Sequence, residues 1–288
     1  MRTNYHLDHV LVFPKLTIIF TLLLLSITEL LAVEQAVVPN TNELRIVTLS
    51  PHLTEIVFAL GLGDQIVGVS DYSDYPVQAS SIKSVASYEG ANIAEIIRLR
   101  PTHILVWRGG NKDADIEKLS LLNINMHESH ITAVNSLITD ILKIGDVLNA
   151  QKEAKVLVDK MNSILNAVIE KYQNESTTAV YYLSTQPLIG LGNDKWLNSL
   201  LSICGIQNIY ANSQSAYPQL QMSHIIRSQA KLLIAASKAA TSEIGKFWEP
   251  YRVVFDAKIV NANPDALHRF TPRAVNEMSR VCDTAYTN

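Results

Sequence analysis

Cysteine is scarce in this chain, which contains only Cys204 and Cys282 among its 288 residues. So few thiols exclude an all-cysteine zinc site and a small disulfide-rich scaffold. Charge of one sign is also scarce, because 24 Lys and Arg residues nearly balance 27 Asp and Glu residues and leave a formal net charge of -3. That balance excludes a strongly basic nucleic-acid-binding protein, so we expect no nucleic acid among its partners.

Long apolar runs are rare too, and the one that stands out lies near the N-terminus. Residues 16–27 form a largely apolar run of about 12 residues, whereas spanning a bilayer takes about 20. Arg2 and Lys15 precede the run, and this arrangement is typical of a secretory signal. We therefore predict a cleavable signal peptide over residues 1–32 and an exported, soluble mature protein. An uncleaved N-terminal anchor is the alternative, and a polytopic membrane protein is excluded.

The motifs that mark common enzymes are missing. The chain has no G-x-S-x-G nucleophile elbow, no H-E-x-x-H zinc motif and no P-loop. Its histidines are scattered without an i, i+4 pair, so we interpret them as surface or core residues rather than metal ligands. No nucleophile and base can be named. We therefore expect a protein that is not an enzyme and that holds no metal and no cofactor.

Export changes how the two cysteines are interpreted. Cysteines pair readily in an oxidising compartment, and a bridge from Cys204 to Cys282 would close a loop of roughly 80 residues, worth about 4–5 kcal/mol in the chain-entropy model. A reactive thiol, the alternative, requires an activating neighbour such as His, and neither cysteine has one beside it in the sequence. We predict a structural disulfide between them.

From Arg45 onward, short apolar strands alternate with helices. In the first half of the chain the pattern predicts strands at 45–49, 66–69, 103–107 and 124–128, and helices at 51–62, 93–99 and 113–122. Ser50 is expected to cap the first helix, with Pro51 at its first position. The second half predicts strands at 179–183, 232–237 and 258–262, and helices at 194–204, 221–229 and from Pro272 onward. This alternation is typical of parallel sheets covered on both faces, and hence of an α/β protein with two lobes.

The most regular segment lies between the two lobes. From Gln151 to Gln173, apolar residues recur at steps of three and four, which predicts an amphipathic helix. Its length of about 34 Å would let it run along both lobes, and it contains no Pro or Gly that would kink it. We predict an N-terminal α/β lobe at 45–132, a helical connector at 133–174 that includes this helix, and a C-terminal α/β lobe at 177–288. The alternative is an ordinary helix within one domain.

Aromatic residues stand in the loops that follow several predicted strands. Tyr72 lies in the turn DYSDYP, Trp107 ends a strand and precedes RGGN, and Tyr88 and Tyr217 lie in two further loops. Open α/β sheets bind ligands beyond the carboxyl ends of their strands, so these four side chains would line a cleft between the lobes. Each could instead pack on the core of its own lobe. Together they favour a ligand with large flat or apolar surfaces.

The stretch TLSPHLTEIVFALGLGDQIVGVSDYSDYP, with WRGGN further on, resembles the periplasmic cobalamin-binding proteins. These belong to the class III solute-binding proteins of ABC importers, and the resemblance covers residues 45–285. It implies two Rossmann-like α/β lobes with central sheets, joined by a single long rigid helix. It also implies a monomer in the periplasm that captures cobalamin or a related corrinoid and delivers it to an inner-membrane ABC permease with its ATPase. The two cysteines fall where those proteins place a disulfide.

The resemblance also implies which residues bind the ligand. It assigns six residues to the corrin pocket: Tyr72, Tyr88, Trp107, Tyr217, Asp265 and Arg269. Arg269 would donate to amide or phosphate oxygens, and Asp265 would accept from an amide; the alternative is a surface ion pair between the two. At Tyr88 and Tyr217 the cobalamin-binding proteins tend to carry Trp, so the aromatic character is kept in a smaller ring.

Two further points concern the docking to the permease and the identity of the ligand. Proteins of this class usually present one exposed glutamate per lobe to the permease, but Ala94 and Ser223 stand at the corresponding positions, which leaves Glu95 as the docking candidate in the first lobe. Haem or a ferric siderophore bound on the same fold is the alternative function. Haem requires an axial Tyr or His, which Tyr72 or Tyr88 could supply, and an anionic siderophore requires several converging arginines.

Overall fold

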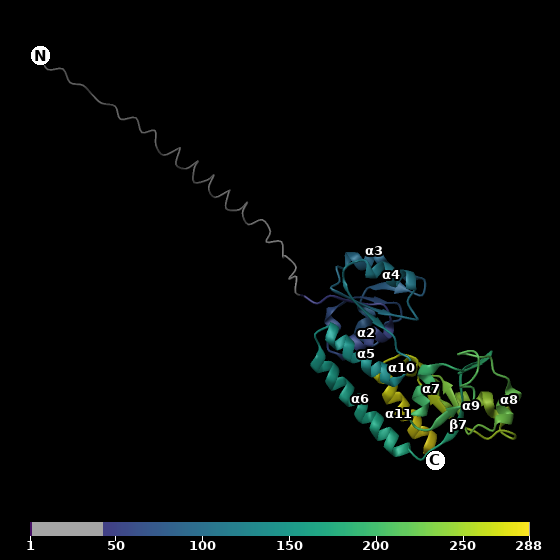
Figure 1. Cartoon of the computed structure of the whole chain (residues 1–288). Helices are drawn as coiled ribbons and strands as arrows, with labels where there is room; N and C mark the ends of the chain where they lie inside the picture. The colour runs from purple at the N-terminus through teal and green to yellow at the C-terminus, as the bar shows by residue number, and fades with distance from the viewer. Residues whose placement is uncertain (2–42, 288) are drawn as a thin grey trace. The chain divides into compact units, whose positions relative to one another are not determined.

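The computed structural model describes residue 1 and residues 43–287, of which residues 44–287 belong to one compact unit (Figure 1). The predicted signal peptide therefore lies, apart from Met1, outside the described residues. Within the described part of the chain, no helix combines the length and the apolar character needed to cross a membrane.

The N-terminal lobe is built on a six-stranded sheet with the strand order β4-β3-β2-β1-β5-β6. The strands are β1 (Ile46–Thr48), β2 (Ile66–Ser70), β3 (Ser84–Ser87), β4 (Gly90–Ala91), β5 (His103–Trp107) and β6 (Asn125–Ser129). All neighbouring strands are parallel except β3 and β4, which are antiparallel. The sheet is therefore mixed, and the short strands β3 and β4 are additions to the sequence-based prediction.

Short helices cover this sheet: α2 (Pro51–Ala59), α3 (Ile93–Arg98) and α4 (Asp113–Ser120). Helix α2 ends three residues before the predicted end at Leu62, since Gly61 adopts a positive φ of 76° that turns the chain away. Ser50 occupies the N-cap position as predicted but its hydroxyl makes no capping bond. It lies instead 3.0 Å from Nδ1 of His52.

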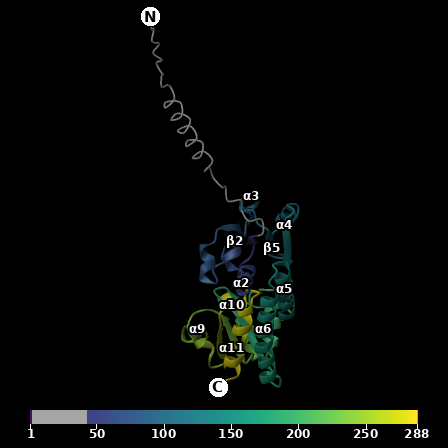
Figure 2. The same cartoon turned by 90° about the vertical axis from the view of Figure 1, so that its left-hand side faces the viewer.

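Two long helices connect the lobes: α5 (Val134–Val147) and α6 (Gln151–Tyr172), the second of which was predicted to within one residue. Helix α6 runs beside α5 at one end and beside α11 (Pro272–Tyr286) at the other (Figure 2). The approach of α5 to α6 is close, because a Cβ atom at Gly145 would stand 2.5 Å from that of Ala154. The connector thus contacts both lobes, because α5 packs against β6 of the N-terminal lobe and α6 packs against α11 of the C-terminal lobe.

The C-terminal lobe contains a mixed five-stranded sheet. Its strands are β7 (Thr177–Thr185), β8 (Leu188–Gly190), β9 (Ile206–Asn208), β10 (Leu232–Ala236) and β11 (Lys258–Ala262). Parallel pairing joins β11, β10, β7 and β9, whereas β8 is antiparallel to β7. The remaining helices are α7 (Lys195–Ser202), α8 (Met222–Ser228), α9 (Thr241–Trp248) and α10 (Pro264–Leu267).

One hydrophobic core extends through both lobes. Alternate strand residues point to opposite faces, so Ile46 of β1 contributes to the central core while Val47 faces the outer layer under α3 and α4. The central core continues through α5 and α6 into the C-terminal lobe, where it ends on Cys204, Cys282 and the inner face of α11. A second outer core lies under α8 and α9.

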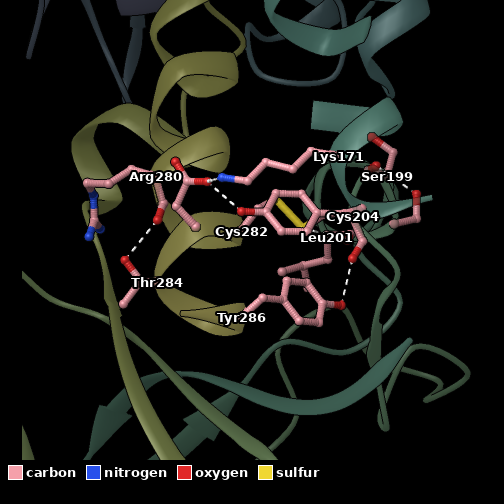
Figure 3. Close-up of a disulfide and its surroundings, with 11 residues drawn as sticks. Lys171, Ser199, Leu201, Cys204, Arg280, Cys282, Thr284 and Tyr286 are labelled. Carbon is pink, nitrogen blue, oxygen red and sulfur yellow. Dashed lines mark hydrogen bonds and ion pairs between the residues drawn. A yellow bond between two sulfur atoms is a disulfide. The ribbon is translucent and has the colours of Figure 1, made fainter. Parts of the chain in front are cut away.

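The predicted disulfide is present. Cys204, just beyond α7, is bonded to Cys282 of α11 with a Cα–Cα distance of 6.0 Å, and both residues are fully buried (Figure 3). The hydroxyl of Tyr286 donates to the carbonyl of Cys204 at 2.7 Å, which adds a second tie between the same two segments. The bridge spans 78 residues of sequence and ties the last helix to the turn between α7 and β9 of its own lobe.

Candidate functional site

The two lobes meet where α2 faces α10 and the segment that leads into α11, and both views place α2 next to α10 (Figures 1 and 2). The carboxyl ends of the parallel strands supply the loops on each side of this meeting point. In the N-terminal lobe these are the turn 71–76 after β2, the loop after β3 and the loop after β5; in the C-terminal lobe the segment 263–271 follows β11. Loops beyond the carboxyl ends of strands are the usual ligand sites of open α/β sheets.

Trp107 is held at the end of β5 by the residues that follow it. Its backbone N–H donates to the side-chain oxygen of Asn111 at 2.7 Å, and the amide nitrogen of the same Asn111 donates to the carbonyl of Leu49 at 2.7 Å. The indole lies against Gly110, where a Cβ atom would stand 1.8 Å from a ring carbon. The WRGGN motif therefore sets the direction of the indole, because any larger residue at position 110 would displace it.

An aromatic cluster joins Trp107 to the other lobe. The ring of Phe270 lies 5.6 Å from Trp107, 5.1 Å from His52 and 5.1 Å from Trp196, centroid to centroid. Burial lowers the pKa of His52 to about 3, so its imidazole is neutral and packs as an aromatic ring. Trp107, which was predicted to line the pocket, is thus partly covered by Phe270 of the C-terminal lobe.

Two of the predicted pocket residues stand open in the N-terminal lobe. Tyr72 is 79% exposed and Tyr88 is 87% exposed. Tyr72 adopts a positive φ of 63°, which is uncommon for an aromatic residue, and its carbonyl accepts a hydrogen bond from Arg269 at 3.4 Å. A small cavity of about 220 Å³ lies beside Tyr72 in this turn. These rings offer apolar surface that the protein itself does not cover.

The predicted residues of the C-terminal lobe already have partners. The hydroxyl of Tyr217 donates to Asp194 at 3.0 Å, and burial together with that carboxylate raises the pKa of Tyr217 to about 12. Asp265 forms an ion pair with Lys238. A separate cavity of about 260 Å³ lies at the carboxyl ends of β7 and β10, and neither Tyr217 nor Asp265 lines it.

Arg269 is the residue that connects the lobes most directly. Its Nη1 donates to Glu55 of α2 at 2.9 Å and to Asp74 of the DYSDYP turn at 2.7 Å. The sequence left open an ion pair between Asp265 and Arg269, and the structure corrects it. Helix α10 ends at Leu267, so Arg269 is not on the same helical face as Asp265 and turns to the opposite lobe.

Arg273 is a functional candidate that sequence reasoning missed, as is its partner Glu55. Arg273 donates to both carboxylate oxygens of Glu55, at 2.7 and 2.5 Å, and to the carbonyl of Asp265 at 3.0 Å. Its guanidinium carbon lies 3.7 Å from the ring centroid of Tyr75. One signal was present in the sequence, since Glu55 is the only carboxylate in the helix sequence PHLTEIVFA, and buried charges require partners.

Glu95, the docking candidate, is not an exposed carboxylate. Its side chain is 11% exposed and forms ion pairs with Lys83 and Arg98. Ala94 and Ser223, at the positions where the class usually carries glutamate, are exposed in the first turns of α3 and α8. The docking chemistry implied by the resemblance therefore has no free carboxylate at these three positions.

Within residues 43–287, no group of three or more His, Cys, Asp or Glu side chains is placed to hold a metal ion. Tyr181 and His268 lie close together, with the phenol oxygen 2.8 Å from Nε2 of the imidazole. Burial raises the pKa of Tyr181 and lowers that of His268, so this pair is a neutral hydrogen bond in the core of the lobe.

Comparison with protein families gives one match that covers most of the chain. A family model described as "Periplasmic binding protein" matches residues 46–247. Among curated proteins, the vitamin B12-binding protein of Vibrio cholerae is 30% identical over 243 residues, which cover 83% of this chain and 87% of that protein. The vitamin B12-binding protein of Vibrio campbellii is 29% identical over 244 residues, covering 83% and 88%.

Solved structures show the same fold. The crystal structure of the periplasmic vitamin B12-binding protein of Vibrio cholerae has a TM-score of 0.75 and 29% sequence identity, covering 84% of this chain and 96% of that chain. The periplasmic haem-binding protein of the same organism has a TM-score of 0.73 and 19% identity, covering 85% and 100%. At that identity the second likeness shows a shared fold alone. The predicted fold class, two α/β lobes joined by a long helix, is confirmed.

Proposed function

This chain belongs to the periplasmic binding protein family, and from that premise we propose that it captures cobalamin or a related corrinoid between its lobes. Members of the family bind solutes for ABC transporters, so the chain is a binding protein and not an enzyme. The observation that carries the proposal is the 30% identity to a vitamin B12-binding protein over 83% of this chain. The proposed site consists of Tyr72, Tyr88, Trp107, Tyr217, Asp265 and Arg269.

The physical character of the site suits such a ligand. A corrinoid combines a wide apolar ring edge with polar amide arms, so it needs aromatic surface and a few hydrogen-bonding groups. Tyr72 and Tyr88 supply exposed rings, and Arg269 supplies a planar set of donors. Burial of about 300 Å² of apolar surface would contribute about 7 kcal/mol, whereas association costs on the order of 4–15 kcal/mol. A cleft preformed by the connector, which contacts both lobes, would lower the part of that cost that comes from ordering the protein on binding.

The setting of the protein follows from the same proposal. We place the mature chain in the periplasm as a monomer, exported by the signal peptide predicted at 1–32, with lobes at 45–132 and 177–288 and the connector at 133–174. Its partner is an inner-membrane ABC permease with its ATPase. Because Glu95 is paired with Lys83 and Arg98, docking through it would require these ion pairs to open.

Haem or a ferric siderophore is the second candidate ligand, supported by the exposed phenol ring of Tyr72 and of Tyr88. Tyrosine is one of the residues that bind haem iron. A siderophore has weaker support, since Arg269 and Arg273 both converge on Glu55 and so already have a carboxylate partner.

Absorbance titration of the purified protein separates these ligands. We expect cyanocobalamin to bind with a shifted corrin spectrum, and haemin and a ferric siderophore to leave the protein unchanged. Binding of haemin with loss in Tyr72→Phe or Tyr88→Phe would favour the second candidate. No spectral or calorimetric response to any corrinoid would contradict the proposal.

A further inference from the structure

Arg269 lies between two carboxylates that come from different elements of the N-terminal lobe. Its Nη1 donates to Glu55 of α2 at 2.9 Å and to Asp74 of the turn after β2 at 2.7 Å. Its Nη2 donates to the carbonyl of Tyr72 at 3.4 Å. The side chain of Arg269 is 16% exposed, and all three of these acceptors belong to the N-terminal lobe.

The two carboxylates differ in burial and in their other contacts. Glu55 is 3% exposed and accepts from Arg273 as well as from Arg269, so it is held from two sides. Asp74 is 58% exposed and stands on a surface turn. Removing a partner from a buried ion pair is strongly destabilising, whereas an exposed ion pair contributes little. Arg269 can therefore exchange Asp74 for another acceptor at small cost, whereas losing its bond to Glu55 would be costly.

We propose that Glu55 is the positioning residue that fixes Arg269 in the cleft, and that Asp74 is a competitor that the ligand displaces. The inference rests on the proposed function, in which Arg269 contacts the ligand. An acceptor oxygen of the ligand, from an amide arm or a phosphate, takes the place of the Asp74 carboxylate on Nη1. Arg269 stays bonded to Glu55 throughout, and its planar guanidinium keeps the direction that the new acceptor requires.

This arrangement makes the two acidic residues act with opposite sign on affinity. The ligand must break the Arg269–Asp74 pair before it binds, so Asp74 weakens binding. Glu55 holds Arg269 and Arg273 in their present orientations, because either side chain would lose this acceptor if it turned away. Glu55 therefore strengthens binding. A purely structural role for both ion pairs would instead make the loss of either one neutral or harmful.

Calorimetric titration with cyanocobalamin tests this with three variants. Asp74→Asn keeps the size of the side chain and removes its charge; we expect affinity to rise about threefold, the worth of an exposed ion pair. Glu55→Gln should lower affinity by about tenfold or more, since Arg269 and Arg273 lose their shared anchor. Asp71→Asn is the matched control, because Asp71 lies in the same turn and is exposed but accepts from Ser84 rather than from Arg269; its affinity should equal that of the wild type.

The outcomes separate the inference from the proposed function. If the wild type binds cyanocobalamin and Asp74→Asn binds it equally or more weakly, the inference is overturned while the proposed function stands. A rise that Asp71→Asn reproduces also overturns it, because the cause would then be net charge. If the wild type binds no corrinoid, both fail. Should Glu55→Gln unfold, the exposed Asp74 variant decides the matter without it.

Discussion

The two lobes differ in how exposed their proposed ligand-binding residues are. In the N-terminal lobe, Tyr72 and Tyr88 are 79% and 87% exposed. In the C-terminal lobe, Tyr217 is bonded to Asp194 and Asp265 is paired with Lys238. The two tyrosines of the first lobe therefore leave more ring surface open to a ligand than Tyr217, which is 47% exposed, although the hydroxyl of Tyr88 also has a partner, Glu89, at 3.3 Å.

In the proposed site this difference would give the lobes different parts in recognition. Covering apolar surface contributes about 25 cal/mol per Å², so the open tyrosines would supply affinity. Tyr217 and Asp265 are themselves partly exposed, at 47% and 39%, and exchanging one such polar partner for another changes the free energy little. The C-terminal lobe would therefore add less to affinity than the open tyrosines.

The largest expected effect concerns the rigidity of the C-terminal lobe. Its last helix is fixed by the Cys204–Cys282 disulfide, and the chain has no other cysteine with which the N-terminal lobe could be crosslinked. Closure of a loop of this length contributes about 4 kcal/mol in the chain-entropy model. Reduction should lower the free energy of unfolding by about that amount, measured by urea denaturation with and without reductant.

A double variant with serine at both cysteines serves as the control for the reductant itself. It should unfold at the same urea concentration whether or not reductant is present. Equal stability of the oxidised and reduced wild type would show that the bridge fixes nothing that the packing of α11 does not already fix.

The second effect tests the aromatic side of the comparison. Trp107→Ala should weaken binding of cyanocobalamin by about 2 kcal/mol, roughly thirtyfold, as expected for a buried aromatic anchor. The indole also packs against Phe270 and His52, so thermal unfolding must show that the variant is folded. Unchanged affinity in a folded variant would falsify the assignment of Trp107 to the pocket.

Gly110→Ala tests the same position without removing the ring. A methyl group there would collide with the indole, so the direction of Trp107 must change and affinity should fall, though less than in Trp107→Ala. Gly245→Ala is the matched control, since its added methyl would come no closer than 3.8 Å to its nearest neighbour, Ile259. Its affinity should be that of the wild type.

How much of this could be predicted from the sequence depends on whether a pattern is local. Helix α6 was predicted to within one residue because its apolar residues recur with a helical period over 22 residues. Strand β5 was predicted because its five residues, HILVW, form a short, mostly apolar run that is followed by a turn. Strands β3, β4, β8 and β9 were not predicted. Each has only two to four residues and exists through pairing with a neighbour, which leaves no period to detect.

The same reasoning applies to the site. Tyr72 and Trp107 could be selected because Trp107 ends a predicted strand and Tyr72 lies in the turn just after another. The contact of Arg273 with Glu55 joins residues 218 positions apart, so no local spacing could indicate it, and Arg269 was instead considered as a partner of the nearby Asp265. Burial of Trp107 by Phe270 likewise depends on how the lobes pack.

A third effect compares one tyrosine from each lobe. Tyr88→Ala removes an exposed ring and should weaken cyanocobalamin binding by about 1 kcal/mol, roughly fivefold. Tyr217→Phe keeps its ring but loses the hydrogen bond to Asp194, and we expect less than about a twofold change. Calorimetry on both variants, with Tyr88→Phe as the control that keeps the ring, measures the contrast. Equal losses in Tyr88→Ala and Tyr217→Phe would contradict the division between the lobes.

The smallest effect concerns the pH dependence of the contact between the lobes. The hydrogen bond from Arg269 lowers the pKa of Asp74, assisted by the charges of Arg269 and Arg273. A carboxyl group whose pKa is lower in the folded than in the unfolded state stabilises the fold above the unfolded pKa, about 3.9, and this contribution is lost as the pH falls through the folded value.

At pH 6 the wild type should therefore be more stable than Asp74→Asn by no more than about 0.5 kcal/mol, since the pair is largely exposed. The difference should shrink as the pH falls below about 4, while Glu55 and the two arginines are common to both proteins. Urea denaturation of the two at pH 6 and pH 3 measures it. A difference that stays constant with pH would mean that the asparagine changes the turn itself rather than the ion pair. In the wild type, protonation of Asp74 also frees Arg269, so the same acidification that weakens the contact between the lobes should strengthen ligand binding, and Asp74→Asn should lose both responses together.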